Sequence, residues 1–299
     1  MMTEIHDHPT NLIVVGLDDS DAARVAAGWA AGQAADRHAR LHLVSAFPIT
    51  GPVSGVADVI PGITQGDTLA ELQRAVQADL MSAHPGLKVT GVVVREEPVR
   101  LLLREAEHAL MLVVATRSAG RLSHVALGSV AFGVTARAHV PVAVIRPGAD
   151  HGDPAGPVVV GVDGSPVSEK ALAFAFAVAS ARHAPLQAVH AWDVDKAFDP
   201  AMPGAAGWSS VNDLADVERV ILAERLAGWR ERYPDVVVES SLLTEKPTDA
   251  LERLSKKAQL VVVGSRGRNR LAGMVLGSTS QHLIVHGSSP VVVVRPDDH

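Results

Sequence analysis

The stretch NLIVVGLDDS at residues 11–20 returns as GPVVVGVDGS at residues 156–165, so the two copies lie 145 positions apart. Each copy is a short run of valine, leucine or isoleucine that ends in aspartate and serine. A run of this length and composition predicts a buried strand, and the polar residues after it predict a turn into a helix. A stretch that occurs twice predicts a fold that is built twice.

Further matches extend the repeat over most of the chain. They share an offset of 149 residues: 97–98 with 246–247, 127–129 with 276–278, and 141–147 with 290–296. The change of offset places four extra residues of the second copy between the Ala46/Ala191 pair and the His84/Tyr233 pair, as expected of a longer loop.

The stretch between the two copies is rich in proline, glycine and aspartate, which is typical of a linker. The sequence therefore predicts a first domain at residues 1–147, a linker at 148–156 and a second domain at 157–299.

Apolar runs and amphipathic segments alternate within each copy. In the second copy the predicted strands are 157–163, 185–192, 235–243, 259–264 and 290–295, and the predicted helices are 166–183, 211–232, 247–257 and 278–287. Continuous apolar strands separated by helices favour a parallel sheet that is covered on both faces. The fold class predicted is α/β, with two tandem doubly wound, Rossmann-like domains of five strands and four helices each.

The composition limits the classes of binding partner and the cellular compartment that we expect. A formal net charge of −6 and a pI near 6.1 argue against a nucleic-acid-binding surface, and the absence of cysteine excludes disulfides and thiolate chemistry. The longest apolar stretch, residues 171–179, is too short to span a membrane. The first ten residues do not resemble a secretory signal. We therefore expect a cytoplasmic protein without a nucleic-acid or membrane partner.

Ligands of doubly wound sheets bind beyond the carboxyl ends of the strands, where the strand order reverses. Asp163 is the first charged residue after the first strand of the second copy, which favours a contact with a ligand hydroxyl. The alternative is structural, because Asp163 or Ser165 can cap the helix that follows. The sequence leaves both interpretations of Asp163 open.

The loop after the fourth strand of the second copy combines glycine, arginine and hydroxyl residues. We expect Gly264 and Gly267 to adopt positive φ and to let the backbone approach a ligand. Gly277 opens a helix whose free N–H groups form an anion site. The remaining candidates in this loop supply hydroxyl donors or positive charge: Ser265, Arg266, Arg268, Arg270, Ser278 and Thr279. Together they predict phosphates on the loop and a ribose on Asp163.

The spacing Gly264-x2-Gly267-x9-Gly277-Ser278 resembles the ATP-binding signature of the universal stress protein family, and the whole chain resembles its tandem two-domain members. The resemblance implies a strand order of 3-2-1-4-5 and ATP as ligand, with or without Mg²⁺. It also implies a backbone contact with adenine at Ala191, and at Ala46 in the first copy. Gly161 and its counterpart Gly16 would lie against the ligand.

The first copy departs from this signature at two positions, where Ala115 and Ser118 replace the glycines. It keeps the other candidates: Gly16, Asp18, Arg117, Arg121, Gly128 and Ser129. A left-handed backbone would cost Ala115 and Ser118 about 1 kcal/mol each. We therefore expect the first copy to bind nucleotide more weakly than the second.

Several other chemistries lack their motifs. The chain has no Gly-Lys dipeptide, no Gly-x-Gly and no Gly-x-Ser-x-Gly, so a P-loop, a Rossmann fingerprint and a nucleophile elbow are excluded. His282 and His286 are four residues apart on a predicted helix, but packing explains them better than a metal site. His6, His8 and His124 are not expected to be catalytic. No metal ligand or catalytic residue is predicted.

The resulting function hypothesis is a stress-response protein in which bound ATP signals a conformation or a choice of protein partner, whose identity stays open. The rivals are a slow ATPase or adenine-nucleotide hydrolase using the same pocket, and an interaction module with both pockets empty. We expect the halves to pair through the fifth strands, 141–146 and 290–295, as a pseudo-dimer within one chain. A further homodimer is compatible with this.

Overall fold

The computed structural model describes residues 11–47, 65–116, 128–149, 152–193, 211–267 and 276–296. The chain divides into two compact units, Met1–Asp150 (unit 1) and His151–His299 (unit 2). Each unit is described by itself below.

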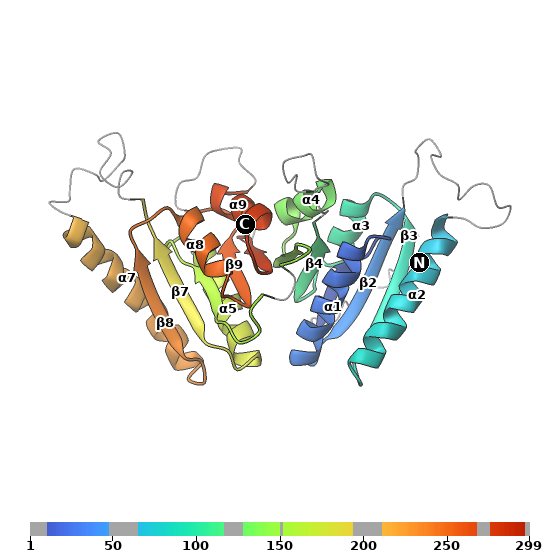
Figure 1. Ribbon diagram of the computed structural model, residues 1–299, viewed down its shortest axis with the longest axis horizontal. Coiled ribbons are helices and arrows are strands. Elements are labelled where there is room, and N and C mark those ends of the chain that lie inside the picture. Colours follow the sequence, from blue (N-terminus) through green and yellow to red (C-terminus); the bar gives the residue numbers. More distant parts are fainter. Residues whose placement is uncertain are drawn as a thin grey trace, which may run out of the picture. The chain divides into compact units, whose positions relative to one another are not determined.

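Unit 1 is a single parallel sheet with helices between its strands (Figure 1). Its strands are β1 (Leu12–Gly16), β2 (Arg40–Phe47), β3 (Val89–Arg95), β4 (Met111–Ala115) and β5 (Val142–Ile145). Its described helices are α1 (Asp21–Asp36), α2 (Gln65–Ala83), α3 (Pro98–Glu105) and α4 (Ser129–Arg137). The strands pair in parallel in the order β3-β2-β1-β4-β5.

Unit 2 repeats this arrangement. Its strands are β6 (Val158–Gly161), β7 (Leu186–Ala191), β8 (Val238–Leu243), β9 (Leu260–Gly264) and β10 (Val291–Val294). Its described helices are α5 (Pro166–Ala181), α7 (Val211–Arg232), α8 (Pro247–Ser255) and α9 (Ser278–His286). The parallel pairing runs β8-β7-β6-β9-β10. Both units therefore confirm the predicted α/β fold, with five parallel strands in the order 3-2-1-4-5 and four helices among the described residues.

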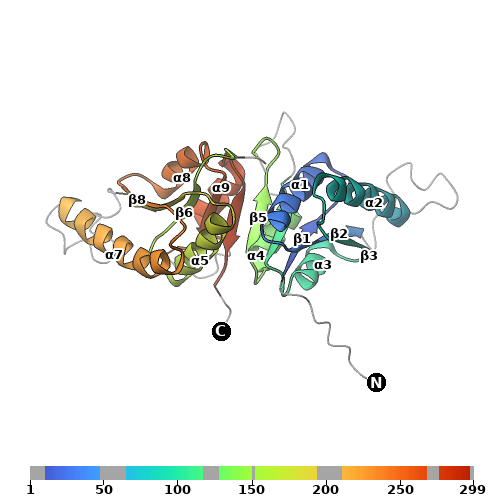
Figure 2. The same cartoon turned by 90° about the horizontal axis from the view of Figure 1, so that it is seen from below.

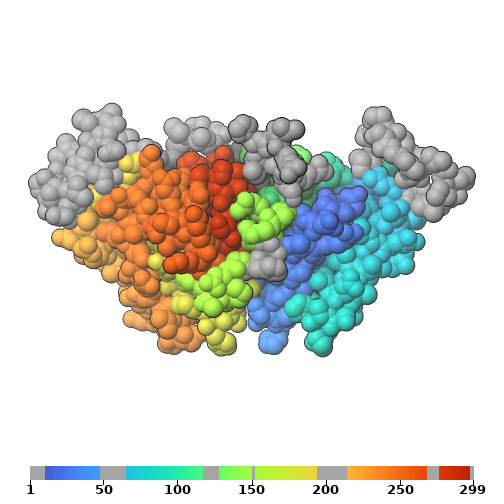
Figure 3. Space-filling view, viewed as in Figure 1, coloured from blue at the N-terminus to red at the C-terminus, as the bar shows by residue number. Residues whose placement is uncertain are grey.

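Helices cover both faces of each sheet. In unit 1, α1 and α2 lie on one face and α3 on the other, and in unit 2 α5 and α7 lie opposite α8 and α9 (Figure 2). Figure 3 shows the surfaces of α1 and α2 side by side on unit 1. Ile13, Val14 and Val15 of β1 are fully buried, which is why the strands are continuous apolar runs. No helix in the described part of the chain combines the length and apolarity needed to cross a membrane.

The first helix of each unit begins and ends in the same way. The Oγ of Ser20 accepts from the backbone N–H of Ala23 at 3.2 Å, and the Oγ of Ser165 accepts from Ser168 at 3.3 Å. His38 and His183, one residue beyond the C-caps, both have φ of 51°. The repeat therefore extends to the backbone of the turns.

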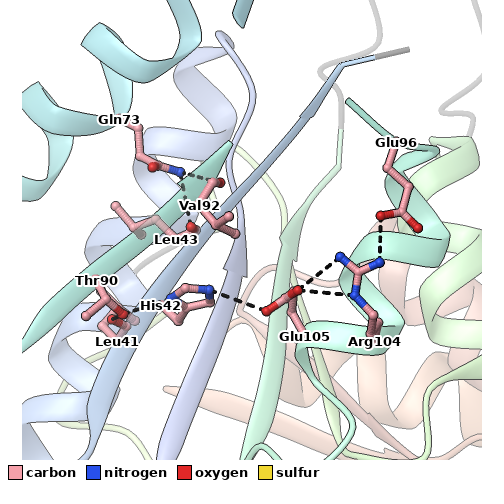
Figure 4. Close-up of polar contacts among 9 residues, drawn as sticks. All are labelled: Leu41, His42, Leu43, Gln73, Thr90, Val92, Glu96, Arg104 and Glu105. Carbon is pink, nitrogen blue, oxygen red and sulfur yellow. Dashed lines mark hydrogen bonds and ion pairs between the residues drawn. The ribbon is translucent and has the colours of Figure 1, made fainter. Parts of the chain in front are cut away.

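A shared ion pair fixes the third helix of each unit. In unit 1, Arg104 of α3 donates to Glu96 at 2.6 Å and also pairs with Glu105 (Figure 4). The hydrogen bond to Glu96 raises the pKa of Arg104 above its ordinary value. Arg253 of α8 pairs with Glu245 at the matching position of unit 2.

Residues 152–156 of the predicted linker pack against unit 2. Asp153 donates its backbone N–H to the carbonyl of Ala258 at 3.0 Å, and Gln259 donates its amide to the carbonyl of Gly156 at 2.8 Å. A Cβ at Gly156 would lie 1.9 Å from the carbonyl oxygen of Lys257, so only glycine fits there. This part of the linker is therefore fixed to the turn between α8 and β9.

Candidate functional site

The strand order reverses beside the first strand of each unit. In unit 2, β6 pairs with β7 on one side and with β9 on the other, and β1 lies between β2 and β4 in the same way. The helices that follow β6 and β9 start on opposite faces of the sheet, which leaves a crevice beyond their carboxyl ends. The predicted site residues of unit 2 follow these strands.

Asp163 lies in the turn that follows β6 in unit 2. Its Oδ1 accepts from the backbone N–H of Ser165 at 3.0 Å and from the Ser165 hydroxyl at 2.6 Å. Asp18 accepts from the backbone N–H of Ser20 at 3.0 Å in the same way. Ser165 is the helix cap and Asp163 shapes the turn before it, so the structural interpretation holds for Ser165. The second carboxylate oxygen of Asp163 faces Gly267.

The expected positive φ at Gly264 and Gly267 is wrong. Among the described glycines of this crevice, positive φ occurs at Gly164, with a value of 77°. Gly264 is needed for space, because a Cβ would lie 2.8 Å from Cγ1 of Val167. Gly267 is needed for the same reason, because a Cβ would lie 2.7 Å from Oδ2 of Asp163. These glycines therefore permit close approach of side chains and not a left-handed backbone.

A cavity of about 320 Å³ opens beside this turn, a volume at the lower end of the usual range for ligand pockets. Its described lining is Gly164, Ser165, Pro166, Val167, Arg266, Gly267 and Pro296. Two donors of the same loop, Nε of Arg266 and Oγ of Ser265, are buried and have no hydrogen-bond partner among the described residues. Buried donors of this kind are rare without a ligand or water, so the loop favours a ligand that accepts hydrogen bonds.

The amino end of α9 lies next to this loop. Gly277 donates its backbone N–H to the carbonyl of Ser265 at 2.6 Å, and the first intrahelical bond runs from Gln281 to Gly277 at 3.0 Å. No described side chain caps the helix, so the N–H groups of Ser278 and Thr279 have no intrahelical acceptor. These groups and the helix dipole favour an anion. Gly277 and Ser278 lie outside the described lining of the cavity but beside it in the fold.

The amino end of α4 in unit 1 has the same form. Phe132 donates its backbone N–H to Gly128 at 2.9 Å, and no described side chain caps the helix that starts at Ser129. Thr116 holds the position of Ser265, and its buried hydroxyl also lacks a partner among the residues that the structure describes. Unit 1 therefore keeps the described parts of the anion site.

Gly161 and Gly16 have a packing role. A Cβ at Gly161 would lie 3.1 Å from Leu251 of α8, and a Cβ at Gly16 would lie 3.3 Å from Leu102 of α3. Both glycines therefore let a helix approach the first strand, and a contact with ligand stays a prediction for each.

The predicted adenine contacts Ala191 and Ala46 fall at the carboxyl ends of β7 and β2, on the crevice side of the sheet. Trp192, which sequence reasoning did not select, follows Ala191, and its buried indole N–H has no partner in the described part of the chain. The contact of either alanine with adenine stays a prediction.

Other predicted residues are placed only in part. Ala115 ends β4. Arg117, Ser118, Arg121, Arg268 and Arg270 lie outside the described residues. Sequence reasoning did not select four residues that line the cavity: Gly164, Pro166, Val167 and Pro296. Their side chains are absent or apolar, so no chemical signal in the sequence marks them as site residues.

His282 and His286 both lie on α9. His282 of α9 lies 2.6 Å from the Glu252 carboxylate of α8, and its ring is 4.6 Å from that of His286. The pair therefore joins two neighbouring helices. The described residues contain no group of three or more side chains suited to a metal ion.

The fold and this crevice define a tandem, doubly wound α/β protein with a candidate ligand site at the switch point of each sheet. The sequence pattern of the universal stress protein family matches residues 10–146 and 155–295. The chain belongs to this family, as its sequence signature indicated.

Similar proteins span nearly the whole chain. Universal stress protein Rv1996 of Mycobacterium tuberculosis is 36% identical over 314 residues, covering 97% of both chains. Universal stress protein Rv2005c of the same organism is 39% identical over 297 residues, covering 95% of this chain and 96% of its own length. The crystal structure of a universal stress protein from Archaeoglobus fulgidus shares the fold with a TM-score of 0.69 at 21% identity, covering 96% of this chain and 98% of its own.

Proposed function

We propose that the chain is a cytoplasmic stress-response protein that binds ATP at the carboxyl end of each sheet, and that the nucleotide signals a conformation or a choice of partner. Phosphates would contact the loop after the fourth strand and the amino end of the next helix. The ribose would contact Asp163 and the adenine the backbone at Ala191, with Asp18 and Ala46 in unit 1.

One observation supports this proposal most strongly. Within the described part of the chain, the loop of unit 2 presents two buried donors without acceptors, Ser265 Oγ and Arg266 Nε, beside the uncapped amino end of α9. A polyphosphate supplies acceptors for all of these groups and the negative charge that a helix amino end favours. Membership of the universal stress protein family agrees with it.

We prefer ATP binding as a signal to ATP hydrolysis because of the side chains near the loop. Hydrolysis needs a base or a water-orienting group at the γ-phosphate. The described part of this loop, residues 265–267, offers a hydroxyl and an arginine but no carboxylate or lysine. The Asp163 carboxylate is engaged by Ser165 and is assigned to the ribose.

The experiment is acid extraction of the purified chain, identification of the released nucleotide, and its quantification after incubation. The proposal predicts intact ATP that persists. Accumulation of ADP or AMP would identify a hydrolase. An empty protein that also fails to bind added ATP, AMP or cyclic AMP would contradict nucleotide binding.

A further inference from the structure

The cavity of unit 2 is lined at two positions that carry aspartate in unit 1. Gly164 and Pro166 line this cavity, and the repeat places Asp19 and Asp21 at the matching positions of unit 1. The cavity is also lined by Arg266, which belongs to the loop that we propose to hold phosphates. The turn into the first helix therefore carries two more carboxylates in unit 1 than in unit 2, at positions that adjoin the phosphate loop.

The same hydrogen bond frames this turn in both units. The Asp18 carboxylate accepts from the backbone N–H of Ser20 at 3.0 Å, and the Asp163 carboxylate accepts from that of Ser165 at 3.0 Å. Each of these bonds spans a single intervening residue. That residue therefore holds the same place in the two turns.

The intervening residue differs in both its backbone and its charge. In unit 2 it is Gly164, whose φ of 77° lies in the left-handed region that favours glycine. In unit 1 it is Asp19, which is not among the described residues with positive φ. The turn of unit 2 therefore favours a residue without a side chain, whereas the turn of unit 1 carries a carboxylate in ordinary backbone geometry.

Asp19 is an exposed negative charge of unit 1. Its carboxylate makes no hydrogen bond or ion pair within the described part of the chain. Asp21 is matched by Arg24, whose Nη1 lies 2.6 Å from its Oδ1. The counterpart of Arg24 in unit 2 is Glu169, which pairs with Arg225 at 2.5 Å. Asp19 is therefore a charge beside the site that the turn of unit 2 does not have.

We propose that Asp19 makes the unit 1 site discriminate against ligand charge, so that unit 1 prefers ATP over AMP by a smaller factor than unit 2 does. The inference rests on the proposed function. Both nucleotides present the same adenosine to the site, but ATP carries more phosphates and therefore more negative charge. A carboxylate beside the phosphate loop repels that additional charge, and salt screens such repulsion between exposed groups.

The test is calorimetric titration of ATP and of AMP without divalent cations at about 0.01 M ionic strength, where charges interact over about 30 Å. The parent is the Gly277→Glu chain, which leaves the unit 1 site to be measured. Asp19→Asn in this parent removes the charge and keeps the size of the side chain. Glu107→Gln is the matched control, because it removes an exposed carboxylate from the turn before β4, at the other end of the strands.

We expect Asp19→Asn to raise the preference for ATP over AMP at least about threefold above that of the parent. The gain should disappear at about 1 M salt, where the screening length is about 3 Å. Glu107→Gln should keep the preference of the parent. An unchanged preference in Asp19→Asn would overturn the inference. A gain that persists at high salt would also overturn it, because a change of shape in the turn would then explain the effect.

The reverse exchange in unit 2 gives a second readout. In the Gly128→Glu chain, Pro166→Asp places a carboxylate where unit 1 has Asp21, at a helix amino end that tolerates acidic residues. Pro166→Asn is the control for the loss of proline. At low salt we expect Pro166→Asp to prefer ATP over AMP about threefold less than Pro166→Asn does. Equal preferences of these two variants would contradict the inference.

These titrations distinguish failure of the inference from failure of the proposed function. If both nucleotides bind but their relative affinities do not respond to Asp19→Asn, the charge discrimination fails and ATP binding stands. If neither ATP nor AMP binds to the unmodified chain, the proposed function fails, and the inference with it. Repeating the titrations with Mg²⁺ adds one more outcome. If Asp19→Asn then lowered ATP affinity, Asp19 would be a metal ligand and not a repelling charge, which would overturn the inference.

Discussion

Units 1 and 2 fill the end of the fourth strand with different pairs of residues. In unit 2, Gly264 lies against Val167, and a Cβ added at Gly264 would lie 2.8 Å from the valine side chain. Unit 1 has Ala115 and Ala22 at the matching positions, a larger residue on the strand and a smaller one on the helix. The exchange adds one carbon on the strand and removes two from the helix, so a smaller helix residue accompanies the larger strand residue in unit 1. A departure from a motif therefore has to be interpreted together with the residue that it contacts.

At the second departure the residue that the glycine faces is aspartate in both copies. Gly267 leaves room for the Asp163 carboxylate, 2.7 Å from the position of a Cβ. Unit 1 keeps the aspartate as Asp18 but has Ser118, which lies outside the described residues, in place of the glycine. The predicted weakness of the unit 1 site now depends on this contact and no longer on the cost of a positive φ.

The largest expected effect comes from Gly264→Ala in unit 2. The new Cβ would collide with Val167, and overpacking of this kind costs about 1–3 kcal/mol. Adding Val167→Ala recreates the pair of unit 1 and should recover part of that loss. Hydrogen exchange of the β9 and α5 amides, compared over the four members of a double-mutant cycle, measures the coupling.

Gly128→Ala is the matched control for this cycle, because a Cβ there meets nothing within 4 Å. It should leave exchange unchanged. If adding Val167→Ala increased the destabilisation caused by Gly264→Ala, the change in side-chain sizes would not explain the difference between the units.

A smaller effect is expected from Gly267→Ser, which gives unit 2 the residue of unit 1. The serine Cβ displaces the Asp163 carboxylate, so ATP affinity at unit 2 should fall about tenfold, or 1.4 kcal/mol. Calorimetry in the Gly128→Glu chain measures it. Gly228→Ala on α7, where a Cβ meets nothing within 4 Å, is the control and should bind as the parent does. Unchanged affinity of Gly267→Ser would remove the basis for unequal sites.

The smallest difference is expected at the helix caps. Ser20→Ala and Ser165→Ala each remove one bond to a backbone N–H, at 3.2 and 3.3 Å, and each should destabilise its own unit by about 1 kcal/mol. Hydrogen exchange of α1 and α5 measures the two losses. If the destabilisation of the two units differed by about 1 kcal/mol, the repeated turns would not be equivalent.

Local patterns predicted the elements closely. The predicted helix 211–232 is α7, and the predicted strand 259–264 is β9 with one residue fewer. Apolar periodicity and capping residues are local signals, so one sequence contains them. The first strand of unit 2 ends at Gly161 and not at residue 163. Asp163 belongs to the turn, where its carboxylate accepts a hydrogen bond from the backbone N–H of Ser165.

Contacts between distant residues were not predictable from one sequence. Gly264 and Val167 are 97 positions apart, so the reason for the glycine becomes visible only in the fold. His190 of β7 and Glu218 of α7 lie 3.2 Å apart although they are 28 positions apart in the sequence, and neither residue belongs to a known motif spacing. The pairing of the two halves through the fifth strands stays a prediction, which cleavage between Gly148 and Gly152 and sizing of the product would test.

The central claim is that the crevice of unit 2 is the tighter of two ATP sites. Its most direct test is calorimetric titration of ATP into the full chain, the Gly277→Glu chain and the Gly128→Glu chain, with alanine at the same positions as the control for bulk. A Cβ at Gly277 meets only ordinary contacts, at 3.4 Å or more, and a Cβ at Gly128 meets nothing within 4 Å, so the fold has room for alanine at both positions. We expect Gly277→Glu to remove a site that is at least about tenfold tighter than the one left, and Gly128→Glu to keep it. Loss of the tighter site in Gly128→Glu, or unchanged binding in both variants, would contradict the account.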